Sequence, residues 1–292
     1  MTGHPMSFWA LVWIEGKKLF SRLLLWVELA VLALLVASLH VAIVATLQTG
    51  GRGELPPDAA RALRQMLTWP DALNTALAFA NGGELGGMLV AILVGAFVAQ
   101  EYTWHTVHLF LSRGVSRVHF LLAKFTVVFV ALALIVLTTL VAGGAVTGVY
   151  TYTREGTLGV VPVGTLAVNM ARVTFTLLPY AALTFLLAVV TRSAMVAIGV
   201  GLGYSLLVEN LMVEMLSLVS DQAARVARFM PTMLAKSIVQ VVTGETQMNV
   251  GMNVAPSLPL LSPNVAALLL GGYTVAFLAL AVWWFRRQDV TV

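Results

Sequence analysis

Residues 23–47 read LLLWVELAVLALLVASLHVAIVATL and carry only one acidic or basic side chain, Glu28. A helix needs roughly 20 apolar residues to cross the ~30 Å hydrocarbon core of a bilayer. This stretch is long enough for a complete crossing and too long for the apolar region of a signal peptide. It therefore predicts an anchored transmembrane helix, and it sets the pattern that the rest of the chain follows.

The composition of the whole chain is that of a membrane protein. Of its 292 residues 59% are hydrophobic and 10% are charged, whereas soluble domains carry roughly 45–50% and about 25%. The mean hydropathy is +0.91. These values exclude a cytosolic enzyme, a disordered protein and a nucleic-acid-binding domain. The small net charge of +4 is interpreted as a topology signal and as contact with anionic lipids. The lack of cysteine excludes disulfides and thiolate metal sites.

The hydropathy pattern predicts an all-α integral membrane protein with a single transmembrane domain over residues 1–292. An amphipathic elbow helix is expected over residues 5–22, in the membrane interface, because Glu15, Lys18 and Arg22 share one face. A cytoplasmic loop is expected over 101–123 and an external segment over 220–263. The six predicted spans are 23–47, 78–100, 124–150, 170–190, 194–218 and 264–285.

An even number of spans places both termini on one side of the membrane. Basic residues crowd the span ends on the side of the termini, while the loops on the other side are longer and carry their basic residues at lower density. The positive-inside rule therefore predicts that both termini are cytoplasmic.

Two pairs of glycines have the spacing of close helix packing. Gly144 and Gly148 lie in the third predicted span, and Gly199 and Gly203 lie in the fifth. Small residues four apart let helix backbones approach each other inside a bilayer. The Gly199–Gly203 stretch has no preceding strand and no lysine of a phosphate-binding loop, so we expect no ATP site in this chain.

Charged residues inside the fourth and fifth spans suggest a pair. The turn at Arg192 makes these spans an antiparallel hairpin, and a rise of about 1.5 Å per residue brings Arg172 level with Glu209 and Glu214. A salt bridge between Arg172 and one of these acids is the first expectation. A proton or substrate site is the alternative, because intramembrane charges are costly and are often functional.

Metal binding and catalysis receive little support from the sequence. His105 and His108 are interpreted as one face of an interfacial helix and Met248 with Met252 as external segment residues, with a metal site as the alternative for either pair. No nucleophile–base spacing points to a membrane enzyme. We therefore expect no metal and no catalytic residue.

The strongest local signal lies in the cytoplasmic loop between the second and third spans. Thr106, Leu109, Phe110 and Arg113 share one helical face, which gives an apolar patch flanked by arginine. An apolar helix face outside the bilayer is suited to a groove on a partner protein. The alternative is a helix that rests on lipid headgroups.

The chain resembles the permease subunits of ABC-2-type bacterial exporters over nearly its whole length. The similarity lies in the elbow with Glu15, Lys18 and Arg22, in a glycine-rich second span, and in the motifs Glu101-Tyr102 with Thr106, Leu111-Ser112-Arg113, Val115-Ser116-Arg117, Lys124, Met230-Pro231-Thr232 and Arg286-Arg287-Gln288-Asp289-Val290. In that family the segment after the second span is a coupling helix that docks into a separate ATPase.

The resemblance implies a transport function without enzymatic activity in this chain. ATP and Mg²⁺ would bind to the partner ATPase, and two permease subunits, identical or different, would enclose the path in the bacterial plasma membrane. A stand-alone proton-coupled carrier that uses Glu209 or Glu214 is the competing class. The substrate is left open. The residues implied in ATPase coupling are Glu101, Thr106, Leu109, Phe110, Arg113 and Arg117.

Overall fold

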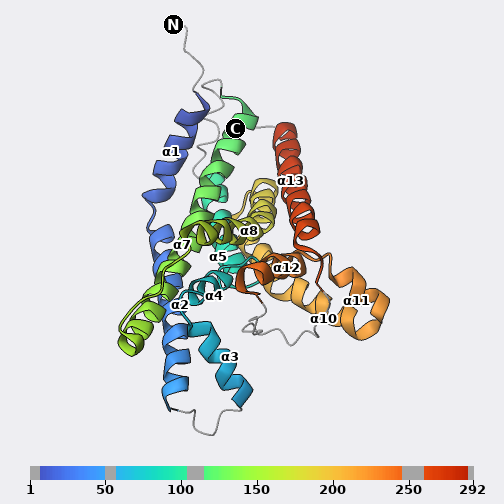
Figure 1. Ribbon diagram of the computed structural model, residues 1–292. Helices are drawn as coiled ribbons and strands as arrows, with labels where there is room; N and C mark the ends of the chain where they lie inside the picture. Colours follow the sequence, from blue (N-terminus) through green and yellow to red (C-terminus); the bar gives the residue numbers. More distant parts are fainter. Residues whose placement is uncertain (1–6, 50–56, 104–114, 245–259, 289–292) are drawn as a thin grey trace.

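The computed structural model describes residues 7–49, 57–103, 115–244 and 260–288, and within these ranges the chain is helical and contains no strand. The helices are α1 (Phe8–Phe20), α2 (Leu23–Thr49), α3 (Pro57–Leu67), α4 (Ala72–Ala78), α5 (Leu85–Thr103), α7 (Arg117–Glu155), α8 (Val163–Thr191), α9 (Ala194–Gly203), α10 (Glu209–Val219), α11 (Asp221–Ala227), α12 (Pro231–Thr243) and α13 (Pro263–Arg287), with a π-helical turn, η1 (Tyr204–Val208), between α9 and α10 (Figure 1).

Within the described residues six helices are long and apolar enough to cross a membrane: α2, α5, α7, α8, α9–α10 and α13. The prediction of an all-α multi-pass membrane protein is therefore confirmed. α1 begins and α13 ends at the same end of the molecule, and α3 lies at the opposite end (Figure 1). We call these the terminal end and the α3 end.

The second span begins later than predicted. Residues 78–84 do not belong to it, because α4 ends at Ala78 and a turn follows before α5 begins at Leu85. Within this turn Gly83 N–H donates to Asn81 Oδ1 (2.8 Å) and Gly82 N–H donates to Thr176 Oγ1 (3.2 Å). The third span is longer than predicted, since α7 already begins at Arg117 and continues to Glu155.

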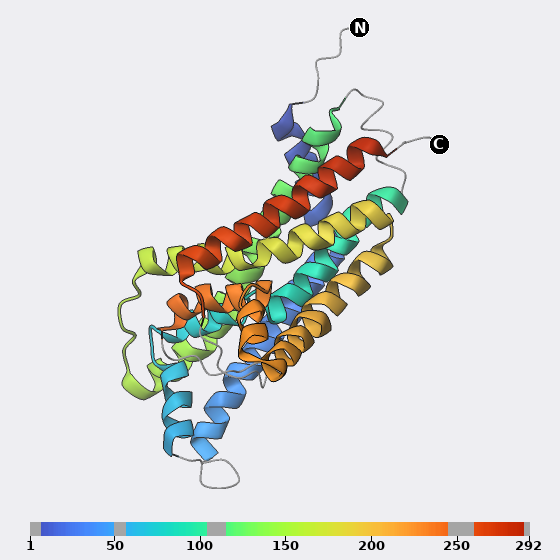
Figure 2. The same ribbon diagram turned by 90° about the vertical axis from the view of Figure 1, so that its right-hand side faces the viewer.

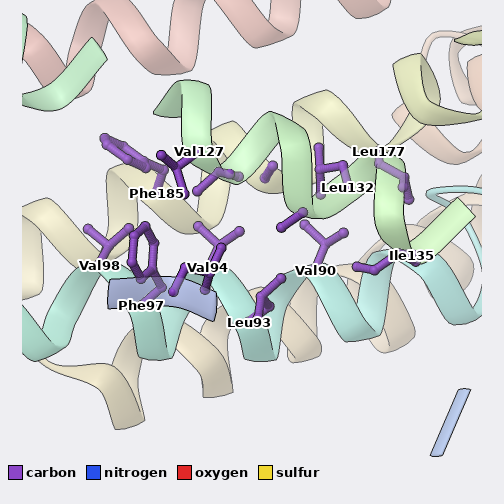
Figure 3. Close-up of a cluster of buried hydrophobic side chains, with 14 of the residues drawn as sticks. Val90, Leu93, Val94, Phe97, Val98, Val127, Leu132, Ile135, Leu177 and Phe185 are labelled. Carbon is purple, nitrogen blue, oxygen red and sulfur yellow. The ribbon is translucent and has the colours of Figure 1, made fainter. Parts of the chain in front are cut away.

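The core lies between α5, α7 and α8. Figure 3 shows Phe97 and Val94 of α5 facing side chains of α7 and α8, among them Val127 and Phe185. The outer faces of the spans instead expose apolar side chains, such as Leu34, which is 70% exposed. This inverted pattern fits a lipid environment, where apolar side chains need no burial in protein.

Two short helices, α4 and α12, fill the middle of the bundle. They pack on each other and on α8, and they lie side by side at mid-height between the terminal end and the α3 end (Figure 1). Almost every residue of α12 from Pro231 to Val239 is buried. The predicted external segment 220–263 therefore contributes a helix to the interior instead of lying wholly outside it.

The fourth and fifth spans form the predicted hairpin. α8 ends at Thr191, and the residue that follows it, Arg192, has a left-handed backbone (φ 55°). Ser193 then caps α9 by accepting a hydrogen bond from the N–H of Val196 (3.4 Å). The two helices run side by side in the second view (Figure 2). The turn at Arg192 therefore closes as tightly as the sequence predicts.

Candidate functional site

The candidate site is a group of four charged side chains at the terminal end, which we call the four-charge cluster: Glu15, Lys18, Glu101 and Lys124. Lys124 Nζ lies 2.6 Å from Glu15 Oε2 and 3.1 Å from Glu101 Oε1. Lys18 Nζ lies 2.7 Å from Glu15 Oε1 and 3.0 Å from Glu101 Oε1. Each lysine thus bridges both acids, and the two positive charges balance the two negative ones.

Three helices supply the four-charge cluster. Glu15 and Lys18 are one turn apart on α1, Glu101 lies in the last turn of α5, and Lys124 lies near the start of α7. α1 is held with its charged face inward, because Leu11, Glu15 and Leu19 form its buried stripe. α1 thus turns Glu15 toward the bundle.

The outward face of α1 is apolar and aromatic. Trp9 and Trp13 are 73% and 67% exposed, and Phe20 is also exposed. Lys17 lies over the ring of Trp13, 5.1 Å from its centre. Aromatic side chains with a nearby cation are typical of the boundary between headgroups and hydrocarbon.

The cluster is lined by aromatic rings, and its side chains are buried except for that of Lys18, which is 27% exposed. The side chains of Glu15, Lys124 and Glu101 are 0%, 1% and 3% exposed. Lys124 Nζ lies 4.0 Å from the centre of the Phe97 ring, which adds a cation–π contact in a desolvated place. Burial of ions is costly, so this arrangement is stable only while each charge keeps its partners.

Arg22 borders the cluster at the junction of α1 and α2. Its guanidinium lies 5.3 Å from the centre of the Phe97 ring. Burial lowers the pKa of Arg22, and the negative charges of Glu101 and Glu15 oppose this effect. The side chain thus adds positive charge near Glu15 and Glu101.

The position of the cluster relates it to the predicted coupling loop. Glu101 lies two residues before the end of α5, and Lys124 lies seven residues after the start of α7. The chain between these helices includes residues 104–114, so the cluster ties together the two helices that flank this segment. Four of the predicted coupling residues lie outside the described residues: Thr106, Leu109, Phe110 and Arg113.

Arg117, another predicted coupling residue, binds the end of the last span. Its Nη1 donates to the backbone carbonyls of Phe285 (3.2 Å), Arg286 (3.1 Å) and Gln288 (2.7 Å). The side chain of Gln288 in turn donates to the carbonyl of Val189 at the end of α8 (2.9 Å). Arg117 therefore caps α13 and joins it to α7.

The predicted salt bridge of Arg172 is not formed. Arg172 Nη1 donates to Asn169 Oδ1 (3.0 Å), one turn earlier on α8. Glu209 instead accepts hydrogen bonds from the hydroxyls of Tyr180 and Thr232, and Glu214 is exposed. The rise per residue predicts only the depth of Arg172 and Glu209 along the hairpin. It could not predict that α12 enters the bundle and brings Thr232 to Glu209.

The two glycine pairs differ in their surroundings. An added Cβ on Gly144 would lie 2.8 Å from Leu73, and one on Gly148 would lie 3.4 Å from Trp69, so both glycines pack closely against other parts of the chain. An added Cβ on Gly199 or Gly203 would meet nothing within 4 Å. Gly199 and Gly203 thus make no close approach to the described part of this chain, whereas an added Cβ on Gly201 would lie 2.9 Å from Thr184 and 3.1 Å from Ala91. The prediction that Gly199 and Gly203 serve helix packing stays a prediction.

The candidate metal ligands His105, His108, Met248 and Met252 lie outside the described residues. His119 is exposed and packs edge-on against Phe8. Within the described ranges no three side chains of His, Asp or Glu gather as metal ligands.

The sequence did not indicate that Lys124 and Glu101 belong to one site with the elbow helix. The available signal was Lys124 itself, a lysine followed by a long apolar run. A buried lysine of this kind needs an acidic partner. Glu15 and Glu101 were separately noted but could not be placed beside it without the packing of α1 on α7.

Comparison with known proteins gives a family and no activity. No curated protein matches the chain. The model of a family described as "Protein of unknown function (DUF2705)" matches residues 85–291, which include every span except the first. The chain therefore belongs to the DUF2705 family.

Proposed function

We propose that this chain is the permease subunit of an ATP-driven exporter of the ABC-2 type. Two such subunits would form the path, and separate cytoplasmic ATPases would drive it. The six spans, the termini at one end and the sequence resemblance described above support this proposal. The exposed basic residues Arg286 and Arg287 at the terminal end support a cytoplasmic orientation in a bacterial plasma membrane.

The four-charge cluster is the observation that carries the proposal. A coupling segment can transmit movement only if the helices on either side of it are rigidly connected to the rest of the bundle. Lys124 and Glu101 provide this connection, since each binds partners on two other elements. A push on residues 104–114 would therefore move α1, α5 and α7 together, in the manner of rigid-body switching.

The outward aromatic face of α1 supports the predicted place of the elbow helix. Trp9, Trp13 and Phe20 would lie among lipids at the cytoplasmic interface. In this arrangement the helix connects the interface to the coupling region through Glu15. Membrane lipids are thus proposed as a further partner.

A pull-down of the native ATPase with the tagged permease tests this function. Leu109→Asp and Phe110→Asp place a charge on the predicted docking face, and we expect each to abolish ATPase recovery while membrane insertion is retained. Leu158→Asp is the matched control, because Leu158 is an exposed leucine between α7 and α8, away from the terminal end. Full recovery of the ATPase with both variants would contradict the docking function.

The competing carrier class depends on Glu209 and Glu214. Glu214 is exposed on the outer face of α10, which does not suit a protected proton site. Glu209 is fully buried and keeps this alternative open. A carrier predicts proton-driven transport by the purified chain alone, and the exporter predicts transport only with the ATPase and ATP.

A further inference from the structure

Glu209 occupies a second polar site, far along the chain from the four-charge cluster. It is the first residue of α10, directly after the π-helical turn, and its side chain is 0% exposed. Its Oε2 accepts hydrogen bonds from the hydroxyl of Tyr180 (2.7 Å) and from the hydroxyl of Thr232. Its Oε1 is buried and has no hydrogen-bond partner among the described residues.

The site joins three elements of the bundle. Tyr180 follows Pro179 inside α8, Glu209 follows the π-helical turn of the fifth span, and Thr232 is the second residue of α12. Met230, which precedes α12, makes no side-chain cap. Glu209 therefore closes the N-terminal end of α12 from a neighbouring helix. π-Helical turns of this kind often occur at functional sites.

No positive side chain neutralises Glu209 in the described part of the chain. No nitrogen of Lys, Arg or His lies within 4.0 Å of its carboxyl oxygens there. Tyr204, on the π-helical turn, faces the carboxyl group together with Tyr180. Farther away, Tyr273 of α13 interacts with Tyr204.

Two charged groups lie on the next turn of α12 and beside it. Lys236 is one turn after Thr232 on α12. Glu84 lies near the same helix, because the preceding residue, Gly83, packs so closely on Thr232 that an added Cβ would lie 2.8 Å from Thr232 Cγ2. Burial raises the pKa of Glu84 and lowers that of Lys236, and each charge partly offsets the effect on the other. Glu84 and Lys236 are therefore the charged groups that lie near Thr232 in the described part of the chain.

The balance of energies favours a neutral carboxyl group at Glu209. An isolated carboxylate in an apolar interior pays a large desolvation penalty, and such groups usually become neutral. A helix N-terminus stabilises an anion by far less than this penalty. The hydroxyls of Tyr180 and Thr232 donate to Oε2 and, together with Tyr204 and the backbone of Thr232, oppose the effect of burial, which is the larger of the two. Oε1 is left to hold the proton.

We propose that Glu209 is a proton-binding site that seats α12 against α8 and the fifth span. In its neutral form the carboxyl group joins Tyr180 and Thr232 across the three elements. The proton comes from water and binds Oε1. Its return to water leaves a buried carboxylate without a positive partner among the described residues, and the hydration that this charge demands loosens the N-terminal turn of α12. This site does not depend on the ATPase, so it can exist in an exporter or in a carrier.

Infrared spectroscopy of the purified protein tests the protonation state directly. A neutral carboxylic acid has a C=O stretching band separate from those of carboxylates and amides. We expect Glu209→Gln to remove one such band at neutral pH, and Glu214→Gln, at an exposed position five residues away, to leave that band unchanged. Tyr180→Phe and Thr232→Val should shift the band, because each removes a hydrogen bond to the carboxyl group.

Hydrogen exchange of the α12 amides, corrected for the intrinsic effect of pH, tests the seating of the helix. Alkaline pH should increase exchange in the wild type and leave Glu209→Gln unaffected. The proposal would be overturned if Glu209→Gln removed no carboxylic-acid band and Tyr180→Phe shifted none. Glu209 would then be an ionised carboxylate. Neither measurement uses transport or ATPase binding, so failure here is distinct from failure of the proposed function.

Discussion

Lys124 Nζ lies 2.6 Å from Glu15 Oε2, which joins the start of the third span to a helix 109 positions earlier in the chain. Both side chains are almost completely buried. The pair gives α1 a fixed orientation on the bundle, because α1 cannot rotate about its axis without leaving a charge unpaired. The contact therefore defines how the elbow helix would move with the spans.

Replacement of Lys124 by methionine tests this role. We expect Lys124→Met to lower the free energy of unfolding by up to about 3–5 kcal/mol, because Glu15 and Glu101 would remain buried after losing one of the two lysines that bridge them. Thermal unfolding in detergent measures the loss. Lys17→Met is the control, since Lys17 is exposed on the same end of the molecule and should have a small effect.

A double substitution tests whether Glu15 and Lys124 interact. Glu15→Gln combined with Lys124→Met should recover part of the stability lost with Lys124→Met alone. Strictly additive effects of the two substitutions would show that Glu15 and Lys124 do not interact.

Alanine at two helical glycines should have opposite effects on stability. A Cβ on Gly143 would lie 2.5 Å from Ala76 Cβ and 3.0 Å from His40 Cε1, so Gly143→Ala should cost about 1–3 kcal/mol by overpacking. Gly199 has open space, and Gly199→Ala should be neutral or stabilising by up to about 1 kcal/mol. Thermal unfolding of the two variants compares them, and equal destabilisation would contradict the packing described for α7.

Loss of the Arg117 side chain should loosen the end of the last span. Arg117→Ala removes three hydrogen bonds to carbonyls at the end of α13 and should cost roughly 1–3 kcal/mol locally. Hydrogen exchange at the last turn of α13 should then increase, whereas Arg286→Ala, at an exposed side chain, should leave it unchanged. Unaltered protection in Arg117→Ala would show that the cap contributes nothing.

The orientation in the membrane can be tested with single cysteines, because the chain has none of its own. Leu158→Cys, in the exposed connection between α7 and α8, should react with an impermeant reagent added to intact cells. Ser116→Cys, exposed before α7, should react only after permeabilisation. Labelling of Ser116→Cys in intact cells would reverse the proposed orientation.

The spans could be predicted from the sequence because their signal is local. Apolar length alone identified all six helices, and Arg192-Ser193 marked the hairpin turn. The start of the second span was misplaced because Ala78, Phe79 and Ala80 are apolar, and only the short stretch from Asn81 to Glu84 separates them from α5. Hydropathy does not separate a short buried helix such as α4 from the beginning of a span.

The polar sites were harder to predict because their partners come from distant segments. Charge and depth suggested Arg172 for Glu209, yet the structure brings Thr232 of α12 and Tyr180 of α8 to it. Both partners are uncharged and common in apolar helices, so nothing in the local sequence distinguishes them. Only the entry of α12 into the bundle makes them neighbours of Glu209.

Isolation of the complex from its native membrane tests the central claim most directly. The tagged chain would be purified under mild conditions, its partners identified by mass spectrometry, and ATP hydrolysis measured in the purified sample. The account predicts a stoichiometric ATPase subunit with a phosphate-binding loop, which is lost in Leu109→Asp. A chain that purifies without an ATPase, and that transports its substrate on a proton gradient alone, would contradict it.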